Sequence, residues 1–273
     1  SISPPSGYIN YLGFTSQSAY SVGSSDYFLL NQPIEGLNIS DLAWGTASAA
    51  TVTLSFWVRS SLTGTFGGSL RNSGTARSYP FSYTISSANT WEQKTITISG
   101  DTSGTWLTTN GIGVYVAFTL GSGSSLLGTS GSWSSANYHG PTGATSVVGT
   151  NGATFYITGV QLEKGSVATP FEYRHYGQEL SLCQRYYQNY GSNYPFTWTG
   201  DATSGSNYYY VTSVPVQRAS PTLTITGNAT SGFDAPAAGA LSGTFNNIVV
   251  TATCNSSGAR RYFQFNCTLS AEL

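Results

Sequence analysis

A strict alternation of apolar and polar residues constrains the fold of this chain more than any other feature of its sequence. In the segment Thr51–Arg59 the apolar Val52, Leu54, Phe56 and Val58 alternate with Thr53, Ser55, Trp57 and Arg59. The segment Ile112–Leu120 repeats the pattern. Because the side chains of a strand point alternately to its two faces, this period of two predicts antiparallel strands with one buried face.

Further alternating segments continue the series and define the fold class. They are Tyr8–Phe14, Tyr20–Val22, Tyr27–Leu30, Tyr79–Ile85, Gln93–Ile98 and Thr154–Glu163. Turns rich in Gly, Ser and Asn separate them, and the sequence has no internal repeat that would indicate a β-helix or a propeller. We therefore predict an all-β chain that begins with a jelly-roll β-sandwich.

One segment breaks the β pattern and predicts a domain joint. Between residues 177 and 190, Leu180, Cys183, Tyr187 and Tyr190 recur at helical spacing, which predicts a short linking helix rather than a cover for a sheet edge. Residues 1–176 are then the jelly roll, and residues 177–273 are the helix plus a smaller C-terminal β-module. Strands of that module are expected at Tyr208–Val214, Thr222–Thr226, Gly243–Cys254 and Tyr262–Leu269.

The three cysteines predict free thiols rather than a disulfide framework. The runs Ile248–Cys254 and Tyr262–Cys267 are expected to form a hairpin around Asn255–Arg261. In that register the two cysteines are offset by about five residues, which is too far for a disulfide bond. No Cys-x-x-Cys pair suggests zinc, and we predict neither a metal nor a cofactor.

The charge content excludes several classes of partner. Only 8% of the residues are charged, against about 25% in an ordinary soluble domain, and the net charge is −1. Such a chain cannot release the counterions that drive binding to nucleic acid, so we expect no nucleic-acid partner. No segment approaches the ~20 apolar residues of a spanning helix, so we expect no membrane insertion. The absence of methionine predicts a processed chain or a fragment of a longer one.

The acidic residues do not predict an active site. A glycosidase needs two carboxylates about 5–10 Å apart in one cleft, and no hydrolase motif surrounds the acids of this chain. The candidates are Glu92, Asp101, Glu163, Glu172 and Glu179. Those near Lys164, Arg174 and Arg185 are expected to form structural ion pairs. Two histidines, His139 and His175, do not make a catalytic triad, so we predict no enzyme activity.

A succession of motifs resembles a known family. The motifs are Thr53–Ser61, Asn89–Glu92, Ile157–Gly165, Thr169–Glu172 and Glu179–Tyr187. Their order and spacing resemble the C-terminal regions of bacteriophage tail-fibre and related virion surface proteins. The part through Glu172 resembles a carbohydrate-binding-module type of jelly roll, in which the strand bearing Gln161-Leu162-Glu163 is the last of the sandwich.

This resemblance implies a non-catalytic adhesin on the virion surface, as a tail fibre or another external appendage. The expected partners are a host cell-surface glycan and other virion subunits, and the expected assembly is a homotrimer. The alternative is a structural virion component, such as a capsid decoration or fibre-assembly protein that binds no glycan. A polysaccharide depolymerase is a third interpretation, although the long β-helix usual in such enzymes is missing.

Sugar recognition combines aromatic rings with uncharged hydrogen-bonding groups, and three places in the sequence supply both. The candidates are Trp57, Arg59 and Tyr115 on the polar faces of two strands, Trp133, Tyr138 and His139 on a Gly-rich loop, and Trp198, Tyr208 and Tyr210 near the C-terminus. The first group makes a platform if its strands share a sheet, and otherwise packs on a neighbouring domain or subunit. The loop is either a contact tip or a mobile crossover. Only alternate residues of Tyr208–Tyr210 can share a face, so at least one is expected in the core.

Overall fold

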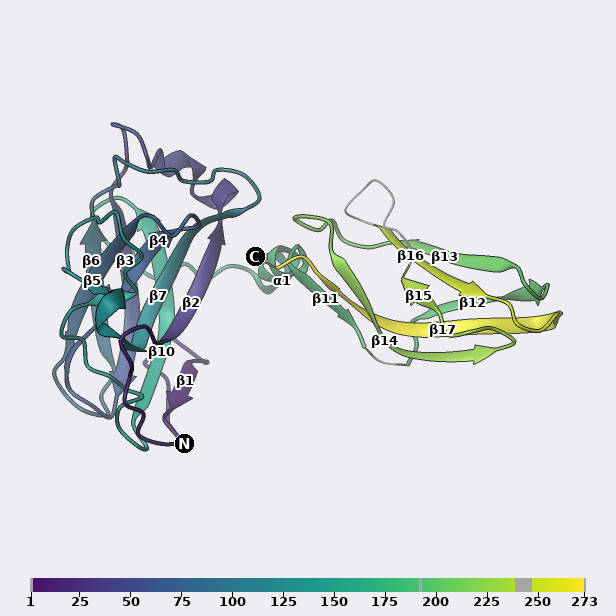
Figure 1. The fold of residues 1–273 in the computed structure, drawn as a ribbon, viewed down its shortest axis with the longest axis horizontal. Helices are drawn as coiled ribbons and strands as arrows, with labels where there is room; N and C mark the ends of the chain where they lie inside the picture. Colours follow the sequence, from purple (N-terminus) through teal and green to yellow (C-terminus); the bar gives the residue numbers. More distant parts are fainter. Residues whose placement is uncertain (1, 192, 239–246, 273) are drawn as a thin grey trace. The chain divides into compact units, whose positions relative to one another are not determined.

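The structure confirms the all-β fold class. A computed structural model describes residues 2–191, 193–238 and 247–272, and strands dominate these residues. The chain divides into two compact units, Ser1–Glu172 and Tyr173–Leu273 (Figure 1). The boundary expected from the sequence lies between residues 176 and 177.

Two antiparallel sheets of four strands, sheet A and sheet B, form the first unit. Sheet A has the order β1 (Leu12–Thr15), β10 (Thr154–Lys164), β3 (Val52–Ser60) and β6 (Glu92–Ile98). Sheet B has the order β2 (Tyr27–Glu35), β7 (Ile112–Ser122), β4 (Gly64–Asn72) and β5 (Ser78–Ile85). Shorter elements are the parallel pair β8 (Leu127–Gly128) and β9 (Gly140–Pro141) and the 3-10 helices Gly36–Asn38, Ser40–Leu42 and Ser124–Leu126. The predicted strand Tyr20–Val22 is wrong, because these residues have no regular structure.

The apolar half of each alternating strand lies between the two sheets. Leu54 and Phe56 of β3 are at most 1% exposed, and Val116 and Phe118 of β7 are at most 4% exposed. The rings of Phe56 and Phe118 meet edge to face across the sandwich, with their centroids 4.9 Å apart. The burial of these side chains, at about 25 cal/mol per Å² of apolar surface, stabilises the sandwich.

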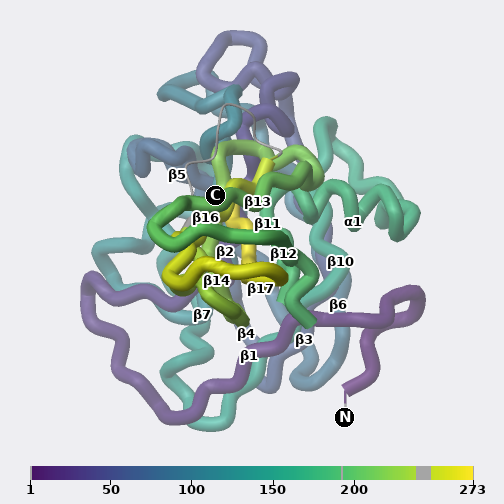
Figure 2. Tube along the Cα trace, turned by 90° about the vertical axis from the view of Figure 1, so that its right-hand side faces the viewer, coloured from purple at the N-terminus to yellow at the C-terminus, as the bar shows by residue number. Residues whose placement is uncertain are grey.

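Flanking chain covers part of the polar face of sheet A, whereas the outward residues of the edge strand β6 remain exposed. The indole nitrogen of Trp91 donates to the carbonyl of Ser3 (2.8 Å), and the Thr158 hydroxyl donates to the carbonyl of Asn10 (2.7 Å). Figure 2 traces this N-terminal segment, in purple, as it leads into β1. On the same face, the Thr53 hydroxyl donates to the carbonyl of Gly165 (2.8 Å) beyond the end of β10.

The second unit is a smaller sandwich. In one sheet, the long strand β17 (Gly258–Ser270) pairs with β14 (Thr222–Ser231) along one edge and with β11 (Tyr187–Tyr190) and β12 (Phe196–Ala202) along the other. The other sheet has the order β13 (Asn207–Ser213), β16 (Asn247–Thr253) and β15 (Ala237–Ala238). Ile248 and Val250 of β16 and Phe263 and Phe265 of β17 are buried between the two sheets. Residues 243–246 of the strand predicted at Gly243–Cys254 lie outside the described residues.

The predicted hairpin between the two cysteine-bearing strands is wrong. Strand β16 pairs with β13 and β15, whereas β17 belongs to the other sheet, so the chain crosses between sheets after Cys254. Cys183, Cys254 and Cys267 are nevertheless free thiols, as expected. Burial raises the pKa of Cys267 to about 11, which keeps this thiol protonated and unreactive.

The predicted linking helix is shorter than its sequence pattern. Helix α1 spans Tyr176–Gln184, whereas Tyr187 and Tyr190 belong to strand β11. Pairing with the edge of β17 gives the backbone of this segment the hydrogen bonds that a continued helix would have made. No residue of α1 is buried, and Leu180 is 40% exposed, so the helical stripe does not form a packed face.

Candidate functional site

The outer face of sheet B gathers polar and aromatic side chains from several strands. Strands β4 and β7 pair so that Arg71 lies opposite Tyr115, and Ser69 lies opposite Ala117 in the next row on this face. Strand β2 continues the second row with Asn31. Ser69 and Ala117 are fully buried and form the floor of this surface, whereas Tyr115 is half-buried.

A fixed segment, residues 132–139, runs over one side of this face, and we call it the strap. The backbones of Ser134 and Ser78 exchange two hydrogen bonds (2.8 and 3.1 Å). The Ser78 hydroxyl donates to the carbonyl of Ala136 (2.6 Å) and accepts from the backbone N–H of Tyr138 (3.1 Å). The loop is therefore not a free crossover, because four hydrogen bonds to Ser78, the first residue of β5, fasten the strap.

The strap ends at a buried histidine. His139 is 3% exposed, and its ring lies edge-on to Tyr27 with the centroids 4.7 Å apart. Neither ring nitrogen has a hydrogen-bond partner among the described residues. Burial, together with the charge of Arg71, lowers the pKa of His139 to about 4. The imidazole is therefore neutral near pH 7 and retains one donor and one acceptor.

Arg71 occupies the centre of the group. Its Nη1 donates to Oδ1 of Asn137 in the strap (3.0 Å), and its guanidinium carbon lies 5.3 Å from the centroid of the Tyr115 ring, a cation–π contact. Burial lowers the pKa of the Arg71 guanidinium below its usual value. Tyr27, which is 59% exposed, joins the group through its ring contact with His139. We call Tyr27, Arg71, Tyr115, Asn137 and His139 the sheet B site.

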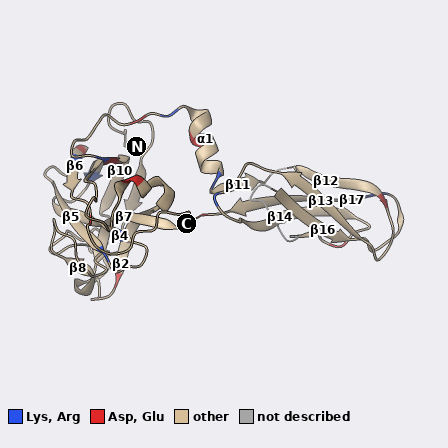
Figure 3. Ribbon diagram, turned by 90° about the horizontal axis from the view of Figure 1, so that it is seen from above, with Lys and Arg blue, Asp and Glu red and all other residues tan. Residues whose placement is uncertain are grey.

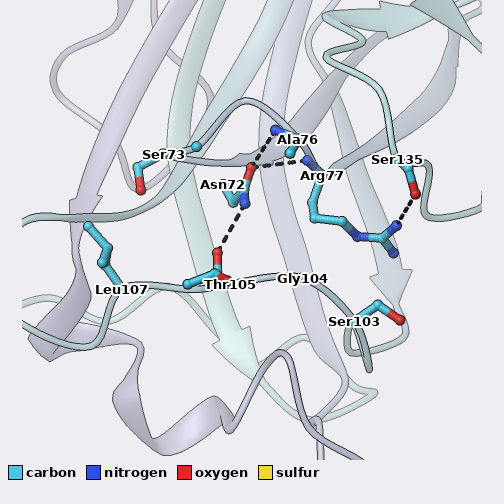
Figure 4. Close-up of a pocket in the computed structure, with 10 residues that line it drawn as sticks. Asn72, Ser73, Ala76, Arg77, Ser103, Gly104, Thr105, Leu107 and Ser135 are labelled. Atoms are coloured by element: carbon cyan, nitrogen blue, oxygen red, sulfur yellow. Dashed lines mark hydrogen bonds between the residues drawn. The ribbon is translucent and has the colours of Figure 1, made fainter.

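A separate hollow of about 560 Å³ lies at the turn between β4 and β5 (Figure 4). The Asn72 carboxamide spans it, accepting two backbone N–H groups of the turn and donating to the carbonyl of Thr105 (3.0 Å). Arg77 also lines it, and its guanidinium is bound to Asp101 and to Ser135. None of the described residues that line it is aromatic, and the hydrogen bonds of Asn72 and Arg77 hold the surrounding loops together.

The predicted platform of Trp57, Arg59 and Tyr115 does not exist. Trp57 and Arg59 are half-buried on β3 of sheet A, whereas Tyr115 is on β7 of sheet B, and the core separates the two outer faces. The alternation pattern identified the outward residues of each strand correctly. It carried no information about which sheet a strand joins.

Trp133 is not at a contact tip, because it packs against the core. Its ring meets those of Trp44 and Trp106, each at a centroid distance of 5.4 Å, and that of Tyr79 at 5.2 Å. Its indole nitrogen donates to the carbonyl of Ser99 (2.7 Å). Of the loop candidates, Tyr138 is half-buried beside Gly128 and only His139 belongs to the sheet B site.

The C-terminal candidates also face inward. Trp198 stacks on Phe263 at 5.8 Å and contacts Tyr208 at 4.7 Å. Tyr210 meets Phe265 edge-on at 5.6 Å. Trp198, Tyr208 and Tyr210 therefore contribute to the core of the second unit and do not form a receptor surface. The expectation that at least one tyrosine of the triplet lies in the core is confirmed, and the exposed one is Tyr209 (57%).

Several acidic side chains have structural partners. Ion pairs among the described residues include Arg77–Asp101, Lys94–Glu92, Lys164–Asp41 and Arg174–Glu179. The pair at Arg174 was expected, but Lys164 reaches Asp41 rather than its neighbour Glu163. The Glu163 carboxylate instead accepts the backbone N–H of Thr169 (3.1 Å).

The described residues contain neither a metal-binding cluster nor a membrane-spanning helix. Within residues 2–191, 193–238 and 247–272, no three His, Cys, Asp or Glu side chains group as metal ligands would. No helix in this part of the chain has the length and apolarity to cross a bilayer. Charged residues are few and scattered over both units (Figure 3).

Comparisons with known proteins give a distant structural likeness. No family model matches the sequence, and no curated protein matches it. A solved structure described as "CBM4 structure and function" aligns with 53% of this chain and 80% of its own length, at 18% sequence identity and a TM-score of 0.29. A likeness at this level does not establish a shared ligand.

Sequence reasoning missed Tyr27, Arg71 and Asn137. Arg71 was not identified because strand β4 was not predicted. Glycines interrupt the alternation of apolar and polar residues in β4, and only Phe66 and Leu70 are apolar residues on its inward face. The spacing of two residues between Phe66, Gly68 and Leu70 was the one sequence feature that indicated a strand here. In such a strand Arg71 faces outward. Asn137 could be found only from the path of the strap.

Proposed function

We propose that this chain binds a glycan, without cleaving it, through the sheet B site. The observation that supports this is the arrangement of Tyr27 and Tyr115 around Arg71 and His139. Each tyrosine ring retains an exposed part, and the two central side chains carry polar atoms with no partner among the described residues. Sugar rings bind to such surfaces by stacking and by hydrogen bonds to groups held in place beforehand.

The proposal that the chain does not cleave the glycan rests on the positions of its acidic side chains. Asp101 and Glu92 are engaged in ion pairs, and neither belongs to the sheet B site. A hydrolase would need two carboxylates facing one sugar linkage. Release of reducing sugar from a bound polysaccharide, abolished by one Glu→Gln change, would contradict this part.

A glycan array tests the proposal. We expect the intact protein to bind at least one glycan, and we expect Tyr27→Ala and Tyr115→Ala each to weaken that binding by about tenfold, or 1.4 kcal/mol. Tyr209→Ala is the matched control, because Tyr209 is as exposed as Tyr27 but lies in the other unit. No binding by the intact protein, or equal losses in all three variants, would overturn the proposal.

We place this activity on the surface of a bacteriophage particle, in a homotrimeric tail fibre or similar appendage that meets a host glycan. The support is the order of motifs from Thr53–Ser61 to Glu179–Tyr187, which resembles that class of protein. A solution mass of about three times 28.8 kDa is expected, and a monomer would contradict the trimer.

A structural virion component is the alternative, and one surface favours it. Tyr209 and Val211 of β13 lie on one face and are 57% and 60% exposed, which suits contact with another subunit. If Val211→Ser prevents assembly and no glycan binds the intact protein, the structural role is the better description.

A further inference from the structure

Two arginines of the first unit lie beside the same strap but differ in what they bind. Nε and Nη2 of Arg77 donate to the two carboxylate oxygens of Asp101 (2.7 and 2.6 Å), and Nη1 donates to the hydroxyl of Ser135 in the strap (3.0 Å). This side-on, two-bond geometry is the one in which a guanidinium matches a carboxylate best.

Arg71 repeats half of this arrangement. Its Nη1 donates to Asn137 of the strap, as that of Arg77 does to Ser135. Its Nε is buried without an acceptor, and its Nη2 has no acceptor among the described residues and is not fully buried. The edge that holds a carboxylate on Arg77 is therefore unbonded on Arg71.

This unbonded edge belongs to a cation that is 7% exposed and forms no ion pair among the described residues. A charge removed from water without an anionic partner is costly, and the Tyr115 ring offsets only part of the loss. His139 beside it is neutral near pH 7 and supplies no counter-charge. A ligand that brings a carboxylate would complete the set of bonds.

We propose that the sheet B site recognises an acidic glycan, whose sugar carboxylate binds Nη2 of Arg71, the part of the unbonded edge that is not fully buried. This inference rests on the proposed glycan binding and specifies its ligand. Because only 8% of the residues are charged and the net charge is −1, general attraction cannot concentrate an acidic polymer here. Binding of such a polymer requires a specific cation.

The test uses pairs of polymers that differ only in charge. Polygalacturonate, hyaluronan and polysialic acid are immobilised, each beside the same polymer after chemical reduction of its carboxyl groups. We expect at least one acidic form to bind about tenfold or more tightly than its reduced partner, as a charge-assisted pair requires. Arg71→Gln should abolish that preference. Arg260→Gln is the charge-matched control, because Arg260 is exposed in the second unit, and it should leave the preference intact.

A second measurement does not depend on a folded variant. In the intact protein, the NMR signal of the Arg71 Nε–H group should shift on addition of galacturonate and stay unchanged with galactose. Dextran sulfate beside dextran distinguishes a carboxylate from a sulfate, and Arg71-dependent binding of the sulfate polymer alone would overturn the carboxylate assignment.

The remaining outcomes separate the two proposals. If only neutral glycans bind, the acidic specificity is wrong and glycan binding stands. If no glycan binds in the array or the paired panel, both fail. Equal losses in Arg71→Gln and Arg260→Gln would indicate a non-specific charge effect and would overturn the role of Arg71.

Discussion

His139 joins the strap to sheet B without using its ring nitrogens. Its backbone N–H donates to the carbonyl of Leu126 (2.7 Å), and its ring packs on Tyr27, yet no described residue bonds either ring nitrogen. A buried imidazole of this kind tolerates no charge, so the stability of the first unit depends on its remaining neutral.

This dependence predicts a pH effect of known sign. The pKa of His139 is about 4 in the folded protein and near 6.5 when unfolded, so the unfolded state binds more protons between these values. The free energy of unfolding should therefore fall as the pH drops from 6.5 to 4, by up to about 3 kcal/mol. Urea denaturation of His139→Gln should lack this loss, whereas His175→Gln, which removes an exposed histidine, should retain it. Equal pH slopes in all three proteins would contradict the assignment.

Trp133 illustrates a residue whose role its sequence context misrepresents. A tryptophan among glycines and serines suggests an exposed tip, but this ring closes a cluster with Trp44 and Trp106 at the edge of the core.

We predict that Trp133→Ala lowers the free energy of unfolding by about 3 kcal/mol, because it removes a large packed ring and leaves a cavity. Chemical denaturation measures this change. Tyr209→Ala, at an exposed ring, should cost less than about 1 kcal/mol. A Trp133→Ala protein of unchanged stability that has lost glycan binding would restore the contact-tip interpretation.

At the scale of elements, strand β4 depends on its glycines. A Cβ on Gly68 would lie 1.8 Å from the carbonyl oxygen of Ala117 in β7, and one on Gly67 would lie 2.2 Å from that of Phe81 in β5. The absence of side chains lets three strands approach closely and leaves room for Pro141, whose ring a Cβ on Gly67 would also meet at 2.4 Å.

Gly68→Ala should therefore disrupt sheet B and abolish cooperative unfolding of the first unit, as followed by circular dichroism. The matched control is Gly177→Ala in α1, where a Cβ would contact nothing within 4 Å. That change should be neutral or stabilise by roughly 0.5–1 kcal/mol, because alanine favours a helix. A fully stable Gly68→Ala protein would show that the strands can separate without cost.

At the scale of the whole molecule, the chain is two sandwiches with separate cores. The buried hydrophobic residues of the first core end with Ile157, and those of the second core begin with Phe196. Each unit therefore has the hydrophobic interior that independent folding requires.

We predict that residues 1–172 and 173–273, produced separately, each unfold cooperatively, and that the glycan binds the first fragment alone. Calorimetry and the glycan array measure the two parts of this prediction. A first fragment that stays unfolded, or a glycan that binds only the second, would contradict it.

The alternation of apolar and polar residues located β3, β7 and β16, but the short alternating segment Tyr20–Val22 forms no strand. The sequence did not reveal β4, in which glycines replace apolar residues. It also did not distinguish a helix from a strand at Tyr187 and Tyr190, because the local pattern allowed both. There the edge of β17 offered backbone hydrogen bonds that outweighed a weak helical preference.

By itself, the sequence determined the all-β class and the inward face of each alternating strand. Both follow from local chemistry, because the alternation of side chains between the two faces of a strand is set within a few residues. Only the tertiary structure decided that Tyr115 faces away from Trp57, that Trp133 is internal, and that Arg71, Tyr115 and His139 meet. Strand pairing and the path of the strap bring together residues far apart in the chain, and no local pattern records which strands pair.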